Sequence, residues 1–166
     1  RRGSRRTPKQ TTLGGGTQIT VPDLMPLARR ISDLLHVYPG LYSLPRKFKI
    51  SLSACSAACG RPWINDVGLI AIRKEGRWGF QVIAAGSLGP RPATGMLCFD
   101  YLPAAHVLPL VLAAVRVFDA HGDREHRSAA RLRHVRQRMG DAAFLELLKG
   151  EFDKAVSEQP WPAVQL

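Results

Sequence analysis

The spacing of apolar side chains changes along the chain, and each spacing predicts a different element. The first apolar positions recur every three or four residues, which predicts a helix that begins after Asp23, a typical N-cap, and ends before Pro39. Residues 46–53 then alternate strictly between apolar and polar side chains, the pattern of a strand with one buried face. Two more apolar strands, at 67–72 and 78–85, flank a hairpin turn.

The second half of the chain predicts helices. After a loop rich in Gly and Pro at 86–95, Pro103 precedes an apolar helix that ends near residue 120. A basic helix is expected at 124–139, and Asp141 is expected to cap a last helix that ends near residue 157. The order of one helix, three strands and three helices predicts an α+β fold, in which helices pack against a small mixed β-sheet.

The length of 166 residues favours a single core. We expect a basic, flexible tail or linker at 1–22, a folded domain at 23–158 and a C-terminal tail at 159–166. No apolar run approaches the ~18 to 20 residues of a membrane span, and the basic start does not resemble a signal peptide. We therefore expect no membrane association. Because the first residue is not Met, we expect a piece of a longer protein.

The charge of the chain narrows the class of its partner. Lys and Arg number 24 against 13 Asp and Glu, which leaves a net charge of +11 and favours a polyanion: a nucleic acid, an acidic protein or an acidic cofactor. Basic residues gather at 1–9 and at 124–138. On the predicted helix, Arg124, Arg127 and Arg131 share a face that either meets several carboxylates or phosphates or is simply solvated.

Two lysines lie on one face of the first predicted strand. Lys47 and Lys49 are two residues apart, which separates them by roughly 6.5 to 7 Å along a strand. Such a pair is typical of a solvated outer face. The alternative is a pair of cationic donors that hold a small oxyanion and supply protons as its oxygens leave.

Two cysteines follow the same strand. Cys55 and Cys59 form a C-x3-C motif, a spacing that lets two thiols share a metal ion or an iron–sulfur cluster. A complete site needs about four ligands, but Cys98 lies in an apolar context that favours a packed thiol. The motif is therefore either a half-site completed elsewhere or a packing feature. Three cysteines do not make a disulfide scaffold, so we expect a reducing compartment, the cytoplasm.

Several strings resemble the sirohaem-dependent sulfite and nitrite reductases. They are LPRKFKI at 44–50, INDVGLIA at 64–71 and the segment that ends in GSLG at 79–89. The stretch from GDR to GDAAF at 122–144 fits the same family. The order of these strings, over about residues 24–152, matches the first of the two pseudo-symmetric halves of those reductases. The resemblance therefore implies that the chain forms one half of the reductase core.

The resemblance implies roles for particular residues. Lys47 and Lys49 would line the distal face of sirohaem and act on sulfite or nitrite. The reaction would be the multi-electron reduction of that oxyanion, with electrons passed from a 4Fe–4S cluster to the haem iron and supplied by ferredoxin or a flavoprotein. Because sirohaem carries many carboxylates, the implied cofactor partners are Arg46, Asn65, Gly86, Gly89, Arg124, Arg127 and Arg131.

The chain also departs from the family pattern. It has no C-x5-C motif, and its C-x3-C stands where the first half of the family has none. Cys55 and Cys59 are therefore candidate cluster ligands whose partners lie outside this chain, in the remaining half of the reductase. A non-catalytic descendant that binds a tetrapyrrole or a partner protein is the main alternative. A basic nucleic-acid-binding module ranks last, because it uses neither LPRKFK nor the cysteines.

Overall fold

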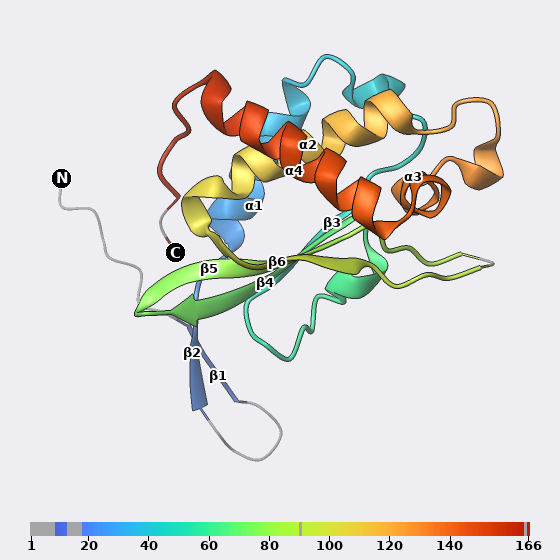
Figure 1. Ribbon diagram of the computed structural model, residues 1–166. Coiled ribbons are helices and arrows are strands. Elements are labelled where there is room, and N and C mark those ends of the chain that lie inside the picture. The colour runs from blue at the N-terminus through green and yellow to red at the C-terminus, as the bar shows by residue number, and fades with distance from the viewer. Residues whose placement is uncertain (1–8, 13–17, 90, 165) are drawn as a thin grey trace.

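The computed structural model describes residues 9–12, 18–89, 91–164 and 166 (Figure 1). Its strands and α-helices follow one another in chain order, with short 3-10 turns between some of them. They are β1 (Lys9–Thr12), β2 (Gln18–Val21), α1 (Met25–His36), β3 (Ile50–Ser53), β4 (Val67–Lys74), β5 (Arg77–Ala84), β6 (Met96–Pro103), α2 (Val107–His121), α3 (Leu132–Met139) and α4 (Asp141–Glu158).

A mixed sheet of four strands forms the centre of the fold. The strand order is β3-β4-β5-β6; β3 runs parallel to β4, and the other neighbours are antiparallel. Figure 1 shows the helices gathered on one side of this sheet. Alternate apolar residues of β4 and β5 point to that side and join the core, among them Leu69, Phe80 and Val82. The predicted α+β fold, with a small mixed sheet and helices packed against it, is confirmed.

The first predicted strand is shorter than expected. Pairing with β4 begins at Ile50, opposite Val67, so the residues before Ile50 lie outside the regular ladder. The predicted alternation still holds there: Phe48 packs against the core and stacks on Phe118 with 5.8 Å between ring centroids, while Lys47 is exposed. The pattern therefore identified the buried face correctly but not the first residue of the strand.

The predicted helix at 124–139 is wrong over its first half. The Asp123 carboxylate accepts hydrogen bonds from the backbone N–H groups of Glu125 and His126. This turn competes with a helix, and α3 begins only at Leu132. Arg131, the residue before it, has extended backbone. The arginines at 124, 127 and 131 therefore share no helical face.

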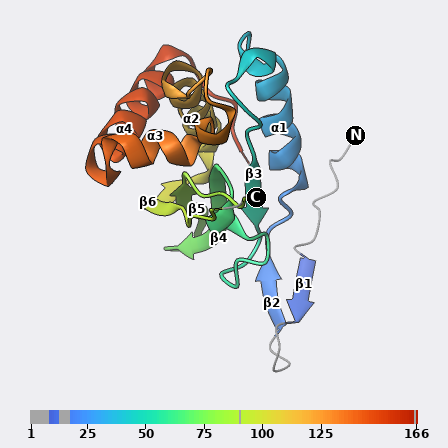
Figure 2. The same ribbon diagram turned by 90° about the vertical axis from the view of Figure 1, so that its right-hand side faces the viewer.

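Three strands were not predicted. Strand β6 pairs with β5 in a register that shifts between Phe80 and Val82, so its side chains do not alternate cleanly in the sequence. Within the predicted tail, β1 and β2 form an antiparallel pair that projects from the rest of the molecule (Figure 2). Residues 1–8 and 13–17 of that tail lie outside the described residues.

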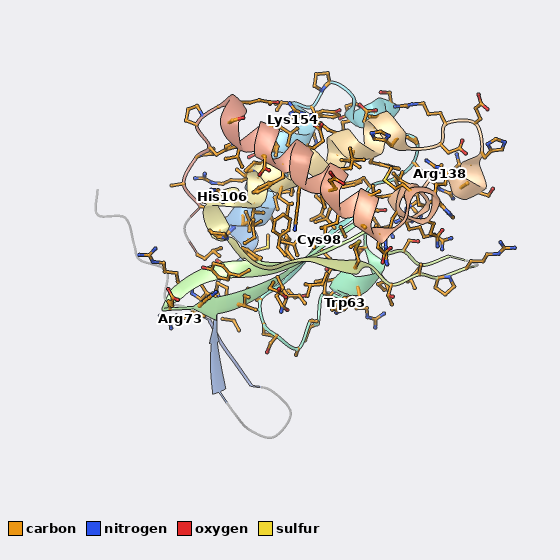
Figure 3. All side chains as sticks on the ribbon, in the orientation of Figure 1. Trp63, Arg73, Cys98, His106, Arg138 and Lys154 are labelled. Carbon is orange, nitrogen blue, oxygen red and sulfur yellow. The ribbon has the colours of Figure 1, made fainter. Side chains whose placement is uncertain are left out.

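Helix α2 is the most buried helix of the described chain. The stretch Ala104–His121 is long and apolar enough to cross a membrane by length and composition, but 61% of it is buried inside the molecule, as in the core helix of a globular domain. Figure 3 shows Cys98 between this helix layer and the sheet. Burial raises the pKa of the Cys98 thiol to about 11. Cys98 is therefore a packed thiol, as its apolar context predicted.

Tyr38 gives the fold a pH dependence that can be measured. Its hydroxyl donates a 2.7 Å hydrogen bond to Asp119, and burial together with this carboxylate raises the pKa of Tyr38 from 10.0 to about 12. The folded state therefore keeps the proton more tightly than the unfolded state, so the stabilisation is complete below pH 10 and is lost as the pH rises toward 12. We expect Tyr38→Phe to lower the free energy of unfolding by about 1 to 2 kcal/mol at pH 8.

The difference between the wild type and Tyr38→Phe should shrink between pH 10 and pH 12. Urea unfolding at a series of pH values measures it. Tyr42, whose side chain is exposed, provides a control in Tyr42→Phe, for which we expect no change at any pH. A difference that stays constant from pH 8 to pH 12 would contradict this prediction.

Candidate active site

A cleft of about 350 Å³ opens at the end of the sheet where β4 begins and β5 ends. Cations dominate its charge, because four of its nine lining residues are Lys or Arg and none is Asp or Glu. The lining residues are Lys47, Lys49, Gly60, Arg61, Ile64, Asn65, Leu88, Gly89 and Arg131. The geometry suits an anionic ligand, since Lys47, Lys49 and Arg61 create a positive potential that no acidic side chain in the lining offsets.

The chain before β3 brings both lysines to this cleft. Phe48 packs into the core between them, so Lys47 and Lys49 are exposed on the opposite side. The backbone of Lys49 is fixed at both polar groups: its N–H donates to the Asp66 carboxylate at 2.9 Å, and its carbonyl accepts from the N–H of Val67 at 3.1 Å. The starting point of the Lys49 side chain is therefore fixed, while both lysines remain exposed to solvent.

A buried ion pair forms the wall behind the lysines. Asp66 is fully buried, and its carboxylate accepts two hydrogen bonds from Arg131, at 2.8 Å from Nη2 and 3.3 Å from Nε. Burial raises the pKa of the Asp66 carboxyl, whereas the hydrogen bonds from Arg131 and from the Lys49 N–H act in the opposite direction. One carboxylate thus joins the segment before β3 to the residue that precedes α3.

Asp66 and its neighbour Asn65 also fix the end of β5, through their backbone carbonyls. The carbonyls of Asn65 and Asp66 accept hydrogen bonds from the N–H groups of Gly86 and Ala85, each at 2.9 Å. A Cβ on Gly86 would lie 2.2 Å from the carbonyl oxygen of Trp63, so only glycine fits at this close approach. Gly86 therefore positions the loop that carries Leu88 and Gly89 to the cleft rather than lining the cleft itself.

The C-x3-C motif forms a tight turn beside the cleft. The N–H of Ala58 donates to the carbonyl of Cys55 at 3.1 Å, and Ala58 has a left-handed backbone conformation. Ser51 and Ser53 of β3 bond to the backbone of Gly60, which fixes the far end of the turn next to Arg61. Cys55 is partly buried and Cys59 is exposed, and both are free thiols.

The structure brings together only some of the residues that the sequence singled out. Lys47, Lys49, Asn65, Gly89 and Arg131 line one cleft. The side chain of Arg46 donates to the backbone carbonyl of Arg127. Arg124 donates to the carbonyl of Ser43 and to Asp119. Arg46, Arg124 and Arg127 are therefore not in the cleft lining, and the contacts of Arg46 and Arg124 hold surface segments together.

The described residues place no further metal ligands around the cysteines. Among the described residues, no group of three or more His, Cys, Asp or Glu side chains could hold a metal ion. Cys55 and Cys59 also lie outside the residues that line the cleft. A cluster on these thiols would therefore need ligands beyond the described part of the chain.

Two residues of the site had no assigned role in the sequence interpretation. Arg61 contributes to the basic lining, and Asp66 anchors Lys49 and Arg131. Both flank short segments that looked like ordinary turns. Their sequence signal was position alone: Asp66 lies directly after Asn65, and Arg61 lies two residues after Cys59.

Known proteins match most of this chain. A family model described as the nitrite and sulphite reductase 4Fe-4S domain matches residues 4–156. The chain is 37% identical over 139 residues to the sulfite reductase (NADPH) hemoprotein beta-component of Acidithiobacillus ferrooxidans, which covers 80% of this chain and 23% of that protein. It is 32% identical over 133 residues to the assimilatory ferredoxin-dependent nitrite reductase of Haloferax mediterranei, which covers 76% of this chain and 23% of that protein.

A solved structure also matches most of this chain. The NirA protein of Mycobacterium tuberculosis superposes with a TM-score of 0.66 and 28% sequence identity, over 82% of this chain and 25% of that chain. The chain therefore spans about a quarter of the length of the relatives that it matches.

Proposed function

Because the chain belongs to the family of the nitrite and sulphite reductase 4Fe-4S domain, we propose that it forms the oxyanion-binding part of a sulfite or nitrite reductase that carries sirohaem and a 4Fe–4S cluster. The observation that carries this proposal is the common cleft of Lys47 and Lys49, which has a basic wall of Arg61 and Arg131 and no acidic lining residue. Further sequence or a second chain would complete the enzyme, since this chain matches about a quarter of its relatives.

The residues of the cleft fit a polycarboxylate macrocycle. Arg61 and Arg131 provide guanidinium groups, which recognise carboxylates well. Asn65 lines the same cleft with its amide nitrogen bonded to the carbonyl of Arg61 at 2.8 Å, so its position is fixed before any ligand binds. When bound, the haem iron would hold the oxyanion and deliver the electrons that the cluster supplies.

The two lysines would act directly on the oxyanion. Their ammonium groups donate hydrogen bonds and stabilise negative charge on the oxygen atoms of sulfite or nitrite. Each oxygen must leave as water and needs protons, which an Nζ group can supply. Because Lys47 and Lys49 are both exposed, solvent can reprotonate them between steps. Both anions suit the same cationic cleft, so the proposal covers either substrate.

Activity of the complete enzyme tests this function. The protein, co-expressed with sirohaem synthesis and with the remaining part of the reductase, is assayed for loss of sulfite and of nitrite with reduced methyl viologen as electron donor. We expect turnover of at least one anion. A coloured protein that reduces neither would instead support the non-catalytic, tetrapyrrole-binding descendant. A colourless protein that binds DNA in a strongly salt-dependent way would support the nucleic-acid module.

We also propose that Cys55 and Cys59 supply two cluster ligands, which the remaining part of the enzyme completes. The turn presents both as free thiols close to the cleft. We expect Cys55→Ser and Cys59→Ser each to reduce iron and acid-labile sulfide severely, because oxygen ligands replace thiolate poorly in iron–sulfur clusters. Cys98→Ser is the matched control, since Cys98 is buried in the core. Full iron and sulfide contents in both variants would leave Cys55 and Cys59 as packing residues.

The remaining partners follow from the same proposal. A ferredoxin or a flavoprotein would donate the electrons; the names of two relatives give NADPH for one and ferredoxin for the other. The three cysteines of the described chain are free thiols, which is consistent with a reducing compartment, and we propose the cytoplasm.

A further inference from the structure

A second pocket lies on the other side of the loop that follows β5. It has a volume of about 450 Å³ and shares no lining residue with the lysine cleft. One wall is loop residues 92–94, and the other is formed by Arg133, Arg136 and Gln137 of α3; Ala85 and Asp141 complete the lining. The hydrogen bond from Arg136 to the carbonyl of Thr94, at 2.9 Å, ties the two walls together. The pocket is therefore defined by fixed contacts rather than by a loose loop.

Arg133 is buried in this pocket without a partner. Only 8% of its surface is exposed, and its Nε–H is fully buried with no hydrogen-bond acceptor. None of the ion pairs formed among the described residues includes it. A buried charge of this kind is costly unless an opposite charge compensates it. The arginine therefore lacks the anion that its burial requires.

The charges around Arg133 make the need for an anion stronger. Burial lowers the pKa of Arg133, and the two neighbouring charges that add to this effect are Arg131 and Arg91, both cations. The nearby carboxylates are already engaged. Asp66 is paired with Arg131, and Asp141 accepts hydrogen bonds from Arg136 at 2.7 and 2.9 Å. Within the described chain, Arg133 is thus surrounded by positive charge that no remaining acid neutralises.

We propose that this pocket binds a small free oxyanion, a phosphate or a carboxylate, through the guanidinium group of Arg133. A planar guanidinium donates paired hydrogen bonds to either group, and Gln137 offers a neutral donor in the same lining. The volume lies within the range of small-molecule sites. The bound anion would also offset the repulsion between Arg133 and Arg131, which lines the lysine cleft.

Binding does not depend on the proposed reductase activity, so the isolated chain can be tested. Isothermal titration with sodium phosphate and with sodium malonate, each against sodium chloride at equal ionic strength, distinguishes the two kinds of anion. We expect the wild-type chain to bind one anion in this pocket, in addition to the anion that the lysine cleft can hold. Arg133→Gln should raise the dissociation constant at least tenfold, because it removes the charge that the anion neutralises. Lys74→Gln is the control, since it removes an exposed cation at the far end of β4 that lines neither pocket, and should change the constant less than twofold.

A measurement on the wild type alone covers the case in which Arg133→Gln does not fold. The Nε–H of Arg133 should exchange more slowly with solvent and shift in the 15N spectrum when phosphate or malonate is added, while the Nε–H of Arg116, paired with Glu158 on the surface, should not. The proposal is overturned if neither anion binds the wild type. It is equally overturned if the bound anion perturbs Arg116 and Arg133 alike, or if a folded Arg133→Gln binds as tightly as the wild type.

Discussion

Replacing Asp66 by alanine is expected to lower the free energy of unfolding by about 3 to 5 kcal/mol, because it leaves the charge of a buried arginine without its partner. The Asp66 carboxylate is fully buried, and the Arg131 side chain is only 10% exposed. The same substitution leaves the Lys49 N–H without an acceptor and adds the loss of that hydrogen bond. The loop before β4, the residues before β3 and the start of α3 would all lose a common anchor.

Urea unfolding at neutral pH measures this effect. Glu158→Ala is the matched control, because it removes the carboxylate from an ion pair in which both side chains are partly exposed, and such pairs contribute at most about 1 kcal/mol. Asp66→Asn should fall between the two, since an amide oxygen can still accept from Lys49 but carries no charge. If Asp66→Ala is no more destabilising than Glu158→Ala, the anchoring role of the buried pair is wrong.

Replacing Lys47 or Lys49 by glutamine in the complete enzyme should lower the turnover number about 10²- to 10⁴-fold while the content of bound tetrapyrrole stays the same. Losses of this size are typical when a proton donor or a group that stabilises a developing oxyanion is removed. Glutamine keeps the approximate length of the side chain and a neutral donor, so the missing features are the positive charge and its transferable proton.

Steady-state kinetics with sulfite and with nitrite measures this loss, and the visible spectrum of each variant measures its cofactor content. Lys74→Gln is the matched control, because Lys74 is an exposed lysine at the opposite end of β4, over the ring of Tyr101. We expect its kinetics to remain those of the wild type. Unchanged turnover in both Lys47→Gln and Lys49→Gln would remove the role assigned to the lysines.

The sequence predicted those parts of the fold that depend on local periodicity. Strict alternation around Phe48 placed the two lysines on the outer face, and the start of α4 was predicted to within one residue, because Gly140 and not Asp141 is its N-cap. Strand β6 was missed because its register with β5 shifts, which hides the period of two. The helix at 124–139 was predicted too long because the prediction rested on the run of basic residues. That run does not show the turn in which Asp123 accepts hydrogen bonds from the backbone of residues 125 and 126.

The candidate site could be predicted from the sequence only for residues that lie within the strings typical of the family. The strings LPRKFKI and INDVGLIA identified Lys47, Lys49 and Asn65, which the fold brings into one cleft. A row of arginines in the sequence does not show which member pairs with a buried carboxylate and which remains without a partner. That difference, between Arg131 and Arg133, arises from contacts between residues 65 positions apart and is visible only in three dimensions.

The visible absorption spectrum of the complete protein, purified after co-expression with sirohaem synthesis, tests most directly whether the basic cleft belongs to an iron tetrapyrrole site. We predict a coloured protein with the bands of a reduced tetrapyrrole, and a spectrum that changes when sulfite or nitrite is added. A folded protein that remains colourless under these conditions would contradict the proposed cofactor and, with it, the reductase function.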